Sequence, residues 1–488
     1  MRIFQRIHTK LNWSLRRYVA VVLAILLLSL LAAGLYHMYK PLPAGLNYTG
    51  KLRHAEVEFL SDQSYVDAAG QLQSEQVIFD RMLKMIEDAQ SLIVLDMFLF
   101  NAETGASQLK HRPLTAELTQ ALIQKRYLNP DIEIKVLTDP INSVYGSVQP
   151  EHYRQMRQAG IDVIETDLTP LRASNPLWSS FWYLCCQGIQ NNPQGGWLPN
   201  PVGEGKVTLR SYFNLANFKA NHRKTLVVDT PDGWQTLVTS MNTHDGSSQH
   251  SNVALLVKGH TAIDVLKTEQ AVGQMSQANM PMLIVGEFEA AKTEPQVQLL
   301  TEQAIYDAVL NSIQSSQKAG IEIDLAMFYL SERRIVQELI AAHQRGVKVR
   351  VLLDPNKDAF GRSKNGIPNR PVAAQLHQAG IDVRWCNTQG EQCHSKMLLK
   401  RDAYNTELIL GSANFTARNL KNYNLESNLR VIGSREAQVF VDAHQYFNQA
   451  WSNLNGRQMS VDYQKYADES RFKYVLYRVM EWTGIGTF

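Results

Sequence analysis

The sequence predicts an α/β protein of two pseudo-symmetric units with mixed or parallel sheets, preceded by one transmembrane helix. Three observations support this: an internal repeat, the alternation of strand-like and helical segments within each copy, and an uncharged apolar run near the N-terminus. The chain has 488 residues, enough for two domains of about 200 residues each. Its charged content of 19% and hydrophobic content of 44% are ordinary for globular proteins and argue against extensive disorder.

The N-terminal segment predicts a membrane anchor. Residues 1–17 form a basic segment with five Lys or Arg and no acid, and residues 18–39 are the expected anchor. The run from Tyr18 to Tyr36 is long enough to span a bilayer, and its basic flank should stay in the cytoplasm. The prediction is a single-pass protein of the inner (cytoplasmic) membrane with a periplasmic body. A cleaved signal peptide is the alternative, because residues 31–34 are Leu-Ala-Ala-Gly, although signal sequences usually have a shorter apolar region.

The charge distribution bears on the class of partner. The formal net charge is +3, but the five basic residues of the N-terminal segment leave −2 for the rest of the chain. A body that binds nucleic acid is more often basic. The balance therefore counts against a nuclease without excluding one.

An internal repeat divides the remaining chain into two copies. Residues 92–98, 134–140 and 158–163 resemble residues 321–328, 349–355 and 378–383, in the same order. The apolar segments are expected to be core strands, and Asp96 and Asp139 need be no more than turn residues at strand ends. The expected organisation is a linker (40–75), a first unit (76–284), a join (285–300), a second unit (301–455) and an amphipathic C-terminal tail (456–488).

The first copy carries an insertion at residues 168–207 that the second copy lacks. It combines many large aromatic residues with Pro, Gly and Asn. Two interpretations are open: an aromatic cluster packed under a long loop, which the usual burial of aromatics favours, or a surface that meets lipid. The same alternatives apply to the apolar face of residues 472–482.

A short motif occurs once in each copy. His222 and Lys224 open an apolar run, as do His394 and Lys396. Side chains alternate along a strand, so each His and Lys should project from the same face. Buried cations are costly unless they face an anion, and two such pairs facing each other would form a phosphate pocket. Matching residues follow each histidine by 18, 20 and 30 positions: Ser240, Asn242 and Asn252 in the first copy, and Ser412, Asn414 and Asn424 in the second.

These motifs resemble the signature of the phospholipase D superfamily, HxKxxxxD followed by GSxN, present twice. Residues 221–229 match the first motif fully, residues 411–416 match the second GSxN, and residues 217–224 are similar to bacterial cardiolipin synthases. The resemblance implies two phospholipase D-type units. Two departures stand out: Arg401 occupies the place of the second Asp, with Asp402 one position later, and Thr239 replaces the Gly before Ser240.

The residues predict a double displacement at phosphorus through a phosphohistidine. Family resemblance favours the histidine of the N-terminal half, His222, as nucleophile, which leaves His394 as general acid and base. Phosphate oxygens would be held by four further residues, so that no metal or other cofactor is expected: Lys224, Lys396, Asn242 and Asn414.

Four more residues complete the predicted site. Ser240 and Ser412 are expected to bind substrate or support the catalytic groups. Asp229 should project from the strand face opposite His222, in a supporting role, and a bulge could bring Asp402 to the matching place. Glu426 stands 32 residues after His394, where the first copy has Ala254, and is expected to orient His394 and keep it protonated.

The four cysteines leave one question open. A disulfide between Cys386 and Cys393 is possible outside the cytoplasm. A zinc site has less support, because no CxxC or HxxxH spacing occurs.

The leading function is a phosphatidyltransferase or phospholipase acting on a glycerophospholipid, with phospholipid and membrane as its partners. An exported, anchored nuclease of the same superfamily and a non-catalytic membrane scaffold are the alternatives. The acceptor (water or alcohol), the head group, the effect of Arg401 and the oligomeric state stay open at this stage.

Overall fold

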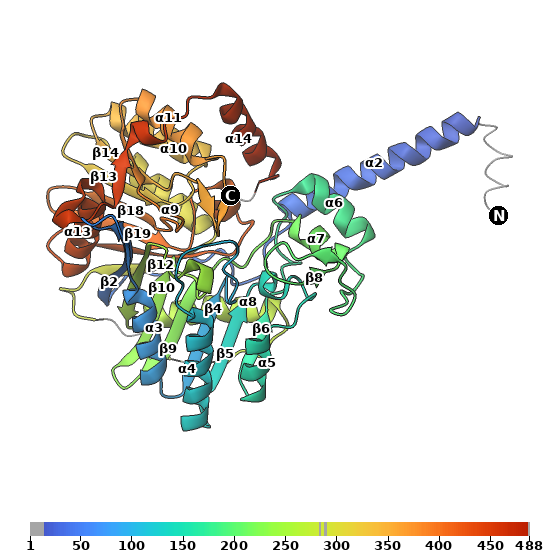
Figure 1. The fold of residues 1–488 in the computed structure, drawn as a ribbon, viewed down its shortest axis with the longest axis horizontal. Helices are drawn as coiled ribbons and strands as arrows, with labels where there is room; N and C mark the ends of the chain where they lie inside the picture. Colours follow the sequence, from blue (N-terminus) through green and yellow to red (C-terminus); the bar gives the residue numbers. More distant parts are fainter. Residues whose placement is uncertain (1–13, 283–284, 287–289, 487–488) are drawn as a thin grey trace.

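The computed structural model describes residues 14–282, 285–286 and 290–486 as two packed α/β units, each built on one mixed sheet (Figure 1). The predicted fold class is confirmed. Most of the basic segment expected at residues 1–17 lies outside the described residues.

The first sheet has eight strands in the order β3-β2-β11-β10-β9-β4-β5-β6. Strands β4, β5 and β6 run parallel, whereas β9, β10, β11 and β2 pair antiparallel. The bounds are β2 Glu56–Val66, β3 Leu72–Glu75, β4 Leu92–Met97, β5 Glu133–Thr138, β6 Asp162–Glu165, β9 Lys224–Thr230, β10 Gly233–Thr239 and β11 Asn252–Lys258. Its helices are α3 Val77–Asp88, α4 Leu114–Leu128, α5 Glu151–Gln158 and α8 Thr261–Met275.

The second sheet repeats this plan with nine strands in the order β1-β12-β20-β19-β18-β13-β14-β17-β21. Its bounds are β1 Arg53–His54, β12 Gln296–Thr301, β13 Glu322–Met327, β14 Lys348–Leu353, β17 Asp382–Cys386, β18 Lys396–Arg401, β19 Asn405–Gly411, β20 Ser427–Ser434 and β21 Ser460–Asp462. The helices are α9 Gln303–Gln314, α10 Arg333–Gln344, α11 Asn369–Gln378 and α13 Gln438–Ser452.

The segments expected to be a linker and a join both contribute strands. β2 pairs with β11 and β12 pairs with β20, so each unit begins with the corresponding outer strand. The expected linker over 40–75 is therefore corrected: it supplies β2 and β3 to the first sheet, and β1 to the edge of the second. The prediction failed because β2 carries polar residues on its less buried positions and lacks a continuous apolar run.

Helix α2, Leu15–Tyr39, projects away from the body, and among its residues only Gly34 is buried (Figure 1). It is 25 residues long with a mean hydropathy of 2.7 over its most apolar window, which is long and apolar enough to cross a membrane. Its C-terminal end packs against the insertion. The His37 ring stacks on Tyr183 with centroids 3.6 Å apart, and a Cβ at Gly34 would lie 2.6 Å from Ser180 Oγ.

The insertion is folded around a core of its own. It contains α6 Pro176–Cys185 and the short hairpin β7 Leu198–Pro199 and β8 Lys206–Val207, and it leads into α7 Leu209–Leu215. Trp182 is buried and Trp178 donates its indole N–H to Phe213 O at 2.8 Å, whereas Leu177 and Trp197 are exposed. The insertion thus has a packed aromatic cluster together with exposed apolar side chains, and contact of the exposed side chains with lipid stays a prediction. Adjacent Cys185 and Cys186 are joined by a disulfide.

Candidate active site

The two motif loops lie where the two units meet. His222 N donates to Leu425 O at 2.9 Å, and His394 N donates to Ser251 O at 2.8 Å. Short parallel bridges therefore join the residues before each histidine to the start of a strand in the opposite unit. This exchange makes the site pseudo-symmetric and brings residues 204 and 142 positions apart into contact.

Each histidine has a polar partner from the other unit. His222 Nδ1 lies 2.9 and 3.0 Å from the two carboxylate oxygens of Glu426. His394 Nδ1 lies 3.2 Å from Asn252 Oδ1. Carboxylate and amide oxygens are acceptors, so each imidazole donates its Nδ1–H and keeps the Nε2 lone pair.

The position of Glu426 corrects the sequence prediction, which placed it beside His394. Glu426 directly follows Leu425, the residue that bridges to the His222 loop, so its side chain meets His222 instead. The equal spacing of Asn252 and Asn424 was also misleading. Strand pairing aligns Thr239 with Ala254 and Gly411 with Asn428, so the second copy is two residues longer here and Glu426 corresponds to Asn252.

The lysines lie beneath the histidines in matching positions. Lys224 Nζ donates to His222 O at 2.7 Å, and Lys396 Nζ donates to His394 O at 2.8 Å. Each ammonium lies 4.9 Å from the centre of a phenylalanine ring, Phe98 or Phe328 respectively. The same rings contact the histidines edge-on, with centroids 4.7 and 4.9 Å apart.

Burial of four basic groups together lowers their pKa values. The pKa of His222 falls to about 4 because of burial, although Glu426 opposes the shift. Burial, with Lys396 beside it, lowers the pKa of His394 well below its ordinary value. Burial lowers the pKa of Lys224 to about 7, and that of Lys396 well below its ordinary range. A phosphate diester carries the charge that would reverse these shifts, as expected of an anion site.

The serines stand behind the histidines. Ser240 Oγ donates to Asn252 Oδ1 at 3.0 Å, and Ser412 Oγ donates to Glu426. Both serines are fully buried, so they support the histidine partners and do not line the substrate cavity. Of the two roles expected for Ser240 and Ser412, these contacts favour support of the catalytic groups over binding of substrate.

The two asparagines of the GSxN motifs do line the cavity. Asn242 Oδ1 accepts a 3.4 Å hydrogen bond from Leu99 N. Asn414 Oδ1 is buried without a hydrogen-bond partner in the described part of the chain. The Asn414 amide is thus a polar group available to a ligand.

Asp229 is not in the pocket, which corrects its inclusion among the catalytic residues. It lies near the far end of β9, where its carboxylate accepts hydrogen bonds from Ser91 N at 2.9 Å and Leu92 N at 2.7 Å. Arg401 lies at the matching end of β18 and pairs with Glu322 of the neighbouring strand. The exchange of Asp for Arg therefore replaces one strand-end contact with another, away from the histidines. Asp402 accepts hydrogen bonds within the following turn, and no bulge carries it toward His394.

Asp139, which was expected to be no more than a turn residue, and its counterpart Asp354 help to build the site. Asp139 Oδ2 accepts a 2.7 Å hydrogen bond from Asn221 N, and Asp354 Oδ2 accepts one of 2.9 Å from Cys393 N. Each holds the backbone just before a catalytic histidine. Burial raises their pKa values to about 7 and about 6. In the sequence, the Asp-Pro pair repeated at the ends of matching strands is the signal that could have identified these two residues.

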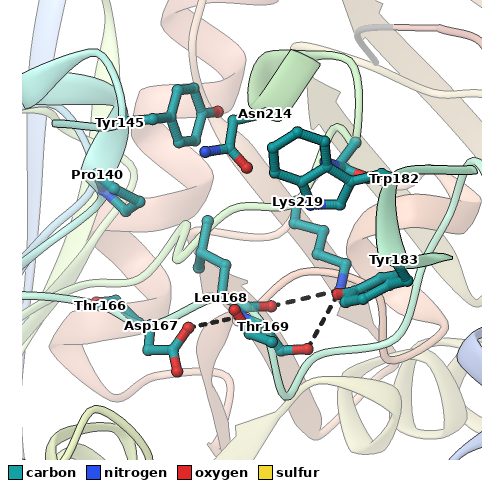
Figure 2. Close-up of a pocket in the computed structure, with 11 residues that line it drawn as sticks. Pro140, Tyr145, Thr166, Asp167, Leu168, Thr169, Trp182, Tyr183, Asn214 and Lys219 are labelled. Atoms are coloured by element: carbon teal, nitrogen blue, oxygen red, sulfur yellow. Dashed lines mark hydrogen bonds between the residues drawn. The ribbon is translucent and has the colours of Figure 1, made fainter. Parts of the chain in front are cut away.

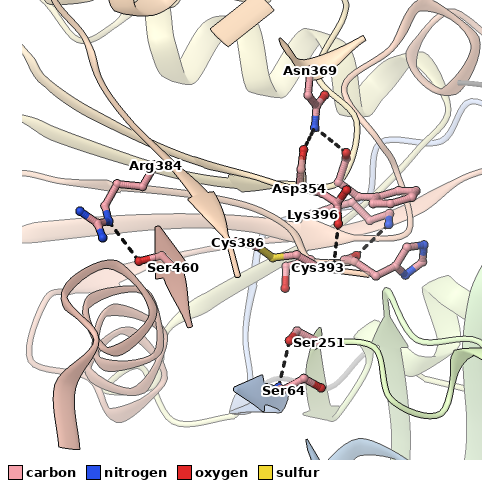
Figure 3. The surroundings of a disulfide bond; sticks show 12 residues. Ser64, Ser251, Asp354, Asn369, Arg384, Cys386, Cys393, Lys396 and Ser460 are labelled. Carbon is pink, nitrogen blue, oxygen red and sulfur yellow. Dashed lines mark hydrogen bonds between the residues drawn. A yellow bond between two sulfur atoms is a disulfide. The ribbon is translucent and has the colours of Figure 1, made fainter. Parts of the chain in front are cut away.

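A disulfide joins Cys386 to Cys393 beside this loop (Figure 3). Cys393 precedes His394, so the bond fixes the approach to the second histidine. In the described ranges, no group of three or more His, Cys, Asp or Glu side chains is arranged to hold a metal ion.

The cavity above the histidines has a volume of about 420 Å³. Both histidines line it together with several aromatic side chains: Phe98, Phe218, Phe328, Tyr329 and Phe360. Imidazole and amide groups in its lining, with aromatic rings around them, suit a phosphodiester that carries an apolar group.

Residues 289–451 match the family model described as "Cardiolipin synthase, PLD-like domain". The second unit is therefore similar to phospholipase D-like domains. The human mitochondrial cardiolipin hydrolase is 28% identical over 137 residues, which are 28% of this chain and 48% of that protein. The mouse protein of the same name is 27% identical over 148 residues, 30% of this chain and 60% of that protein. The chain thus spans about half the length of the curated relatives it matches.

A solved structure shares the fold of both units. The crystal structure of phosphatidylserine synthase from Haemophilus influenzae Rd KW20 matches with a TM-score of 0.54 and 11% identity, covering 89% of this chain and 94% of that one. At this identity the match concerns the fold alone.

Proposed function

We propose that the protein is a membrane-anchored phospholipase D-type enzyme that cleaves or transfers the phosphatidyl group of a glycerophospholipid. The observation that carries the proposal is the pair of His–Lys sets from the two units: both histidines line one aromatic-walled cavity, and each lysine is buried against the backbone of its histidine. A lone buried histidine is usually structural, whereas two matched sets with donor groups around them form a site for a phosphate diester.

In the proposed mechanism His222 Nε2 attacks phosphorus, and the P–O bond to the head group breaks. The resulting phosphohistidine carries positive charge on its imidazole, which the carboxylate of Glu426 stabilises through the 2.9 Å contact at Nδ1. His394, protonated at Nε2 once the anionic phosphodiester is bound, gives this proton to the departing alkoxide and then takes one from the incoming water or alcohol. Attack of that acceptor on phosphorus breaks the P–N bond and restores His222.

The side-chain amides and ammonium groups supply the remaining stabilisation. Lys224, Lys396, Asn242 and Asn414 would hold the non-bridging oxygens as negative charge develops on them. Asn252 is a neutral partner, so it orients His394 without the pKa increase that a carboxylate would cause.

Two features favour a lipid substrate and a membrane location. The body without its basic N-terminal segment carries a formal charge of −2, which does not favour a nucleic-acid groove. Exposed apolar side chains gather on α6 and on α14, Arg471–Thr483, the helix near the C-terminus; among them are Leu177 and Phe181 on α6 and Phe472 and Trp482 on α14. α6 packs against the base of α2, so an anchored α2 would hold this face close to the bilayer.

The function is tested by supplying phosphatidylglycerol labelled in its head group to the full-length protein, which is either solubilised in detergent or reconstituted into vesicles. Release or transfer of the head group by the wild type, and its loss in His222→Ala, support the proposal. Single-stranded DNA incubated under the same conditions separates the nuclease alternative. Cleavage of DNA without turnover of lipid would overturn the proposed substrate class, and inactivity on both substrates would favour a scaffold.

A further inference from the structure

A second, smaller cavity adjoins the active site on the side of the insertion. Its volume is about 190 Å³, well above the ~10–15 Å³ that a single water needs by this measure. Tyr145 and Lys219 line both cavities, so the two spaces share a wall, and His222 lines the larger one. Trp182 and Tyr183 of α6 close the far side (Figure 2). The second unit has no corresponding insertion.

Some polar side chains of this cavity have hydrogen-bond partners within the protein, and others do not. Lys219 Nζ donates to Leu171 O at 2.6 Å and to the Tyr183 hydroxyl. In contrast, the Tyr145 hydroxyl and the Asn214 side-chain amide make no hydrogen bond to any part of the chain that the structure describes. Figure 2 shows them beside each other at one end of the cavity. Both side chains are half-buried, so these groups are open to water or to a ligand in the cavity.

The backbone that presents Tyr145 is strained and firmly held. Val144 and Tyr145 have φ values of +48° and +55°, which are uncommon for residues other than glycine. Ser211 of α7 donates its hydroxyl to Val144 O at 2.6 Å, and Asn191 of the insertion donates to Tyr145 O at 2.8 Å. The same turn begins at Asp139, which fixes the backbone before His222. Strain maintained by this many contacts is typical of functional positions.

The available groups select a neutral, hydroxylated ligand. Burial, with Asp139 nearby, raises the pKa of Tyr145 well above its ordinary value, so the phenol keeps its proton and can donate. Burial lowers the pKa of Lys219 well below its usual range, and its nitrogen already donates to a carbonyl and a hydroxyl. An anionic group would therefore find no free cation in this cavity. A phenol, a carboxamide and an indole wall suit a small polyol.

We propose that this side cavity, between Tyr145, Asn214 and Trp182, binds the polyol acceptor and directs one of its hydroxyls toward the phosphohistidine. The proposal rests on the proposed function and deepens it. The acceptor oxygen forms the new P–O bond, the bond between phosphorus and His222 Nε2 breaks, and the hydroxyl proton passes to His394. The product is a new phosphodiester, so a filled cavity favours transfer over hydrolysis. Free glycerol and the glycerol head group of phosphatidylglycerol share the required chemistry.

The test measures the ratio of transfer product to hydrolysis product in one reaction, which is independent of the total rate. Tyr145→Phe removes the hydroxyl and keeps the ring, and Asn214→Ala removes the amide. Each lost hydrogen bond should lower the ratio about three- to tenfold and raise the acceptor concentration at half-maximal transfer by a similar factor. The matched control is Tyr212→Phe on α7, whose hydroxyl bonds only to Pro199 O at an exposed site.

Separate arms with free glycerol and with phosphatidylglycerol vesicles identify the source of the acceptor, because the affected arm is the one that uses the cavity. An unchanged ratio in both variants and both arms, with lipid cleavage intact, would overturn the inference and leave the proposed function standing. Wild-type protein that cleaves no phospholipid would instead refute the proposed function. If a variant is poorly folded, a binding measurement decides the question. Ligand-observed NMR compares glycerol binding to folded His222→Asn protein with glycerol binding to the same protein carrying Tyr145→Phe. Equal binding by the two proteins would count against the cavity.

Discussion

The contact between His222 and Glu426 allows the roles of the two histidines to be tested by one substitution. Glu426→Gln keeps the size of the side chain and removes its charge. In the structure the carboxylate accepts hydrogen bonds from His222, Ser412 and Asn419, which are all donors. A glutamine has one acceptor oxygen and an amino group, so at least one of these donors would face another donor.

The expected loss follows from the charge that develops on His222. A hydrogen bond to a charged group contributes about 1.5–3 kcal/mol. At about 1.4 kcal/mol per tenfold change, phosphohistidine formation should slow by roughly 10- to 150-fold. Glu426 raises the pKa of His222, so its removal lowers that pKa further below about 4. His222 is neutral at pH 6–8 in both proteins, and the loss should therefore be constant across that range.

The assay is the burst of nitrophenol released from a nitrophenyl phosphodiester, followed by stopped flow. Nitrophenolate leaves without a proton, so the step reports on the nucleophile and not on the general acid. Glu407→Gln is the matched control, because Glu407 is a buried carboxylate of β19 that accepts hydrogen bonds from Ser312 and Arg430. It should lower stability and leave the burst rate per folded molecule unchanged. A burst that is equally fast in Glu426→Gln would refute the reasoning and indicate that Glu426 supports the general acid instead of the nucleophile.

Three further outcomes follow from the same geometry. His394→Ala should form the phosphohistidine from a nitrophenyl substrate and accumulate it, because nothing activates the acceptor. Mass spectrometry of the peptide that contains His222 checks this, and a phosphoryl group on residue 394 of the wild type would reverse the roles. Asp229→Ala should lower the free energy of unfolding by about 1–3 kcal/mol, because it leaves backbone amides at the start of β4 unpaired. Its kcat should stay within about twofold of the wild-type value, and a much larger loss of kcat in folded protein would restore Asp229 to the site. Replacing Cys386 and Cys393 by Ser removes a disulfide between cysteines seven positions apart. The free energy of unfolding, measured with denaturant, should fall by about 2–3 kcal/mol. Equal stability of the oxidised and reduced wild type would contradict a structural role for the bond.

The repeat explains why much of the fold was predictable from the sequence. Apolar strands at matching positions in the two copies, followed by helical periodicity, are local patterns. The pairing of His222 with Lys224 and of His394 with Lys396 is also local, because alternation along a strand places residues two apart on the same face. The sequence therefore determined two similar α/β units, each with a His–Lys pair entering a core strand.

Only the tertiary structure decided which residues from one unit complete the site of the other. Glu426 meets His222 across 204 residues because backbone hydrogen bonds join the two motif loops to opposite units, and spacing along one copy contains no information about that exchange. Asp229 illustrates the opposite case: it matches the motif, but the length of β9 carries it away from the cavity. The outer strand β2 was missed because its burial depends on a partner, β11, almost 200 residues later. Local periodicity fixes the face on which a side chain lies, whereas the group it contacts depends on how distant segments pair.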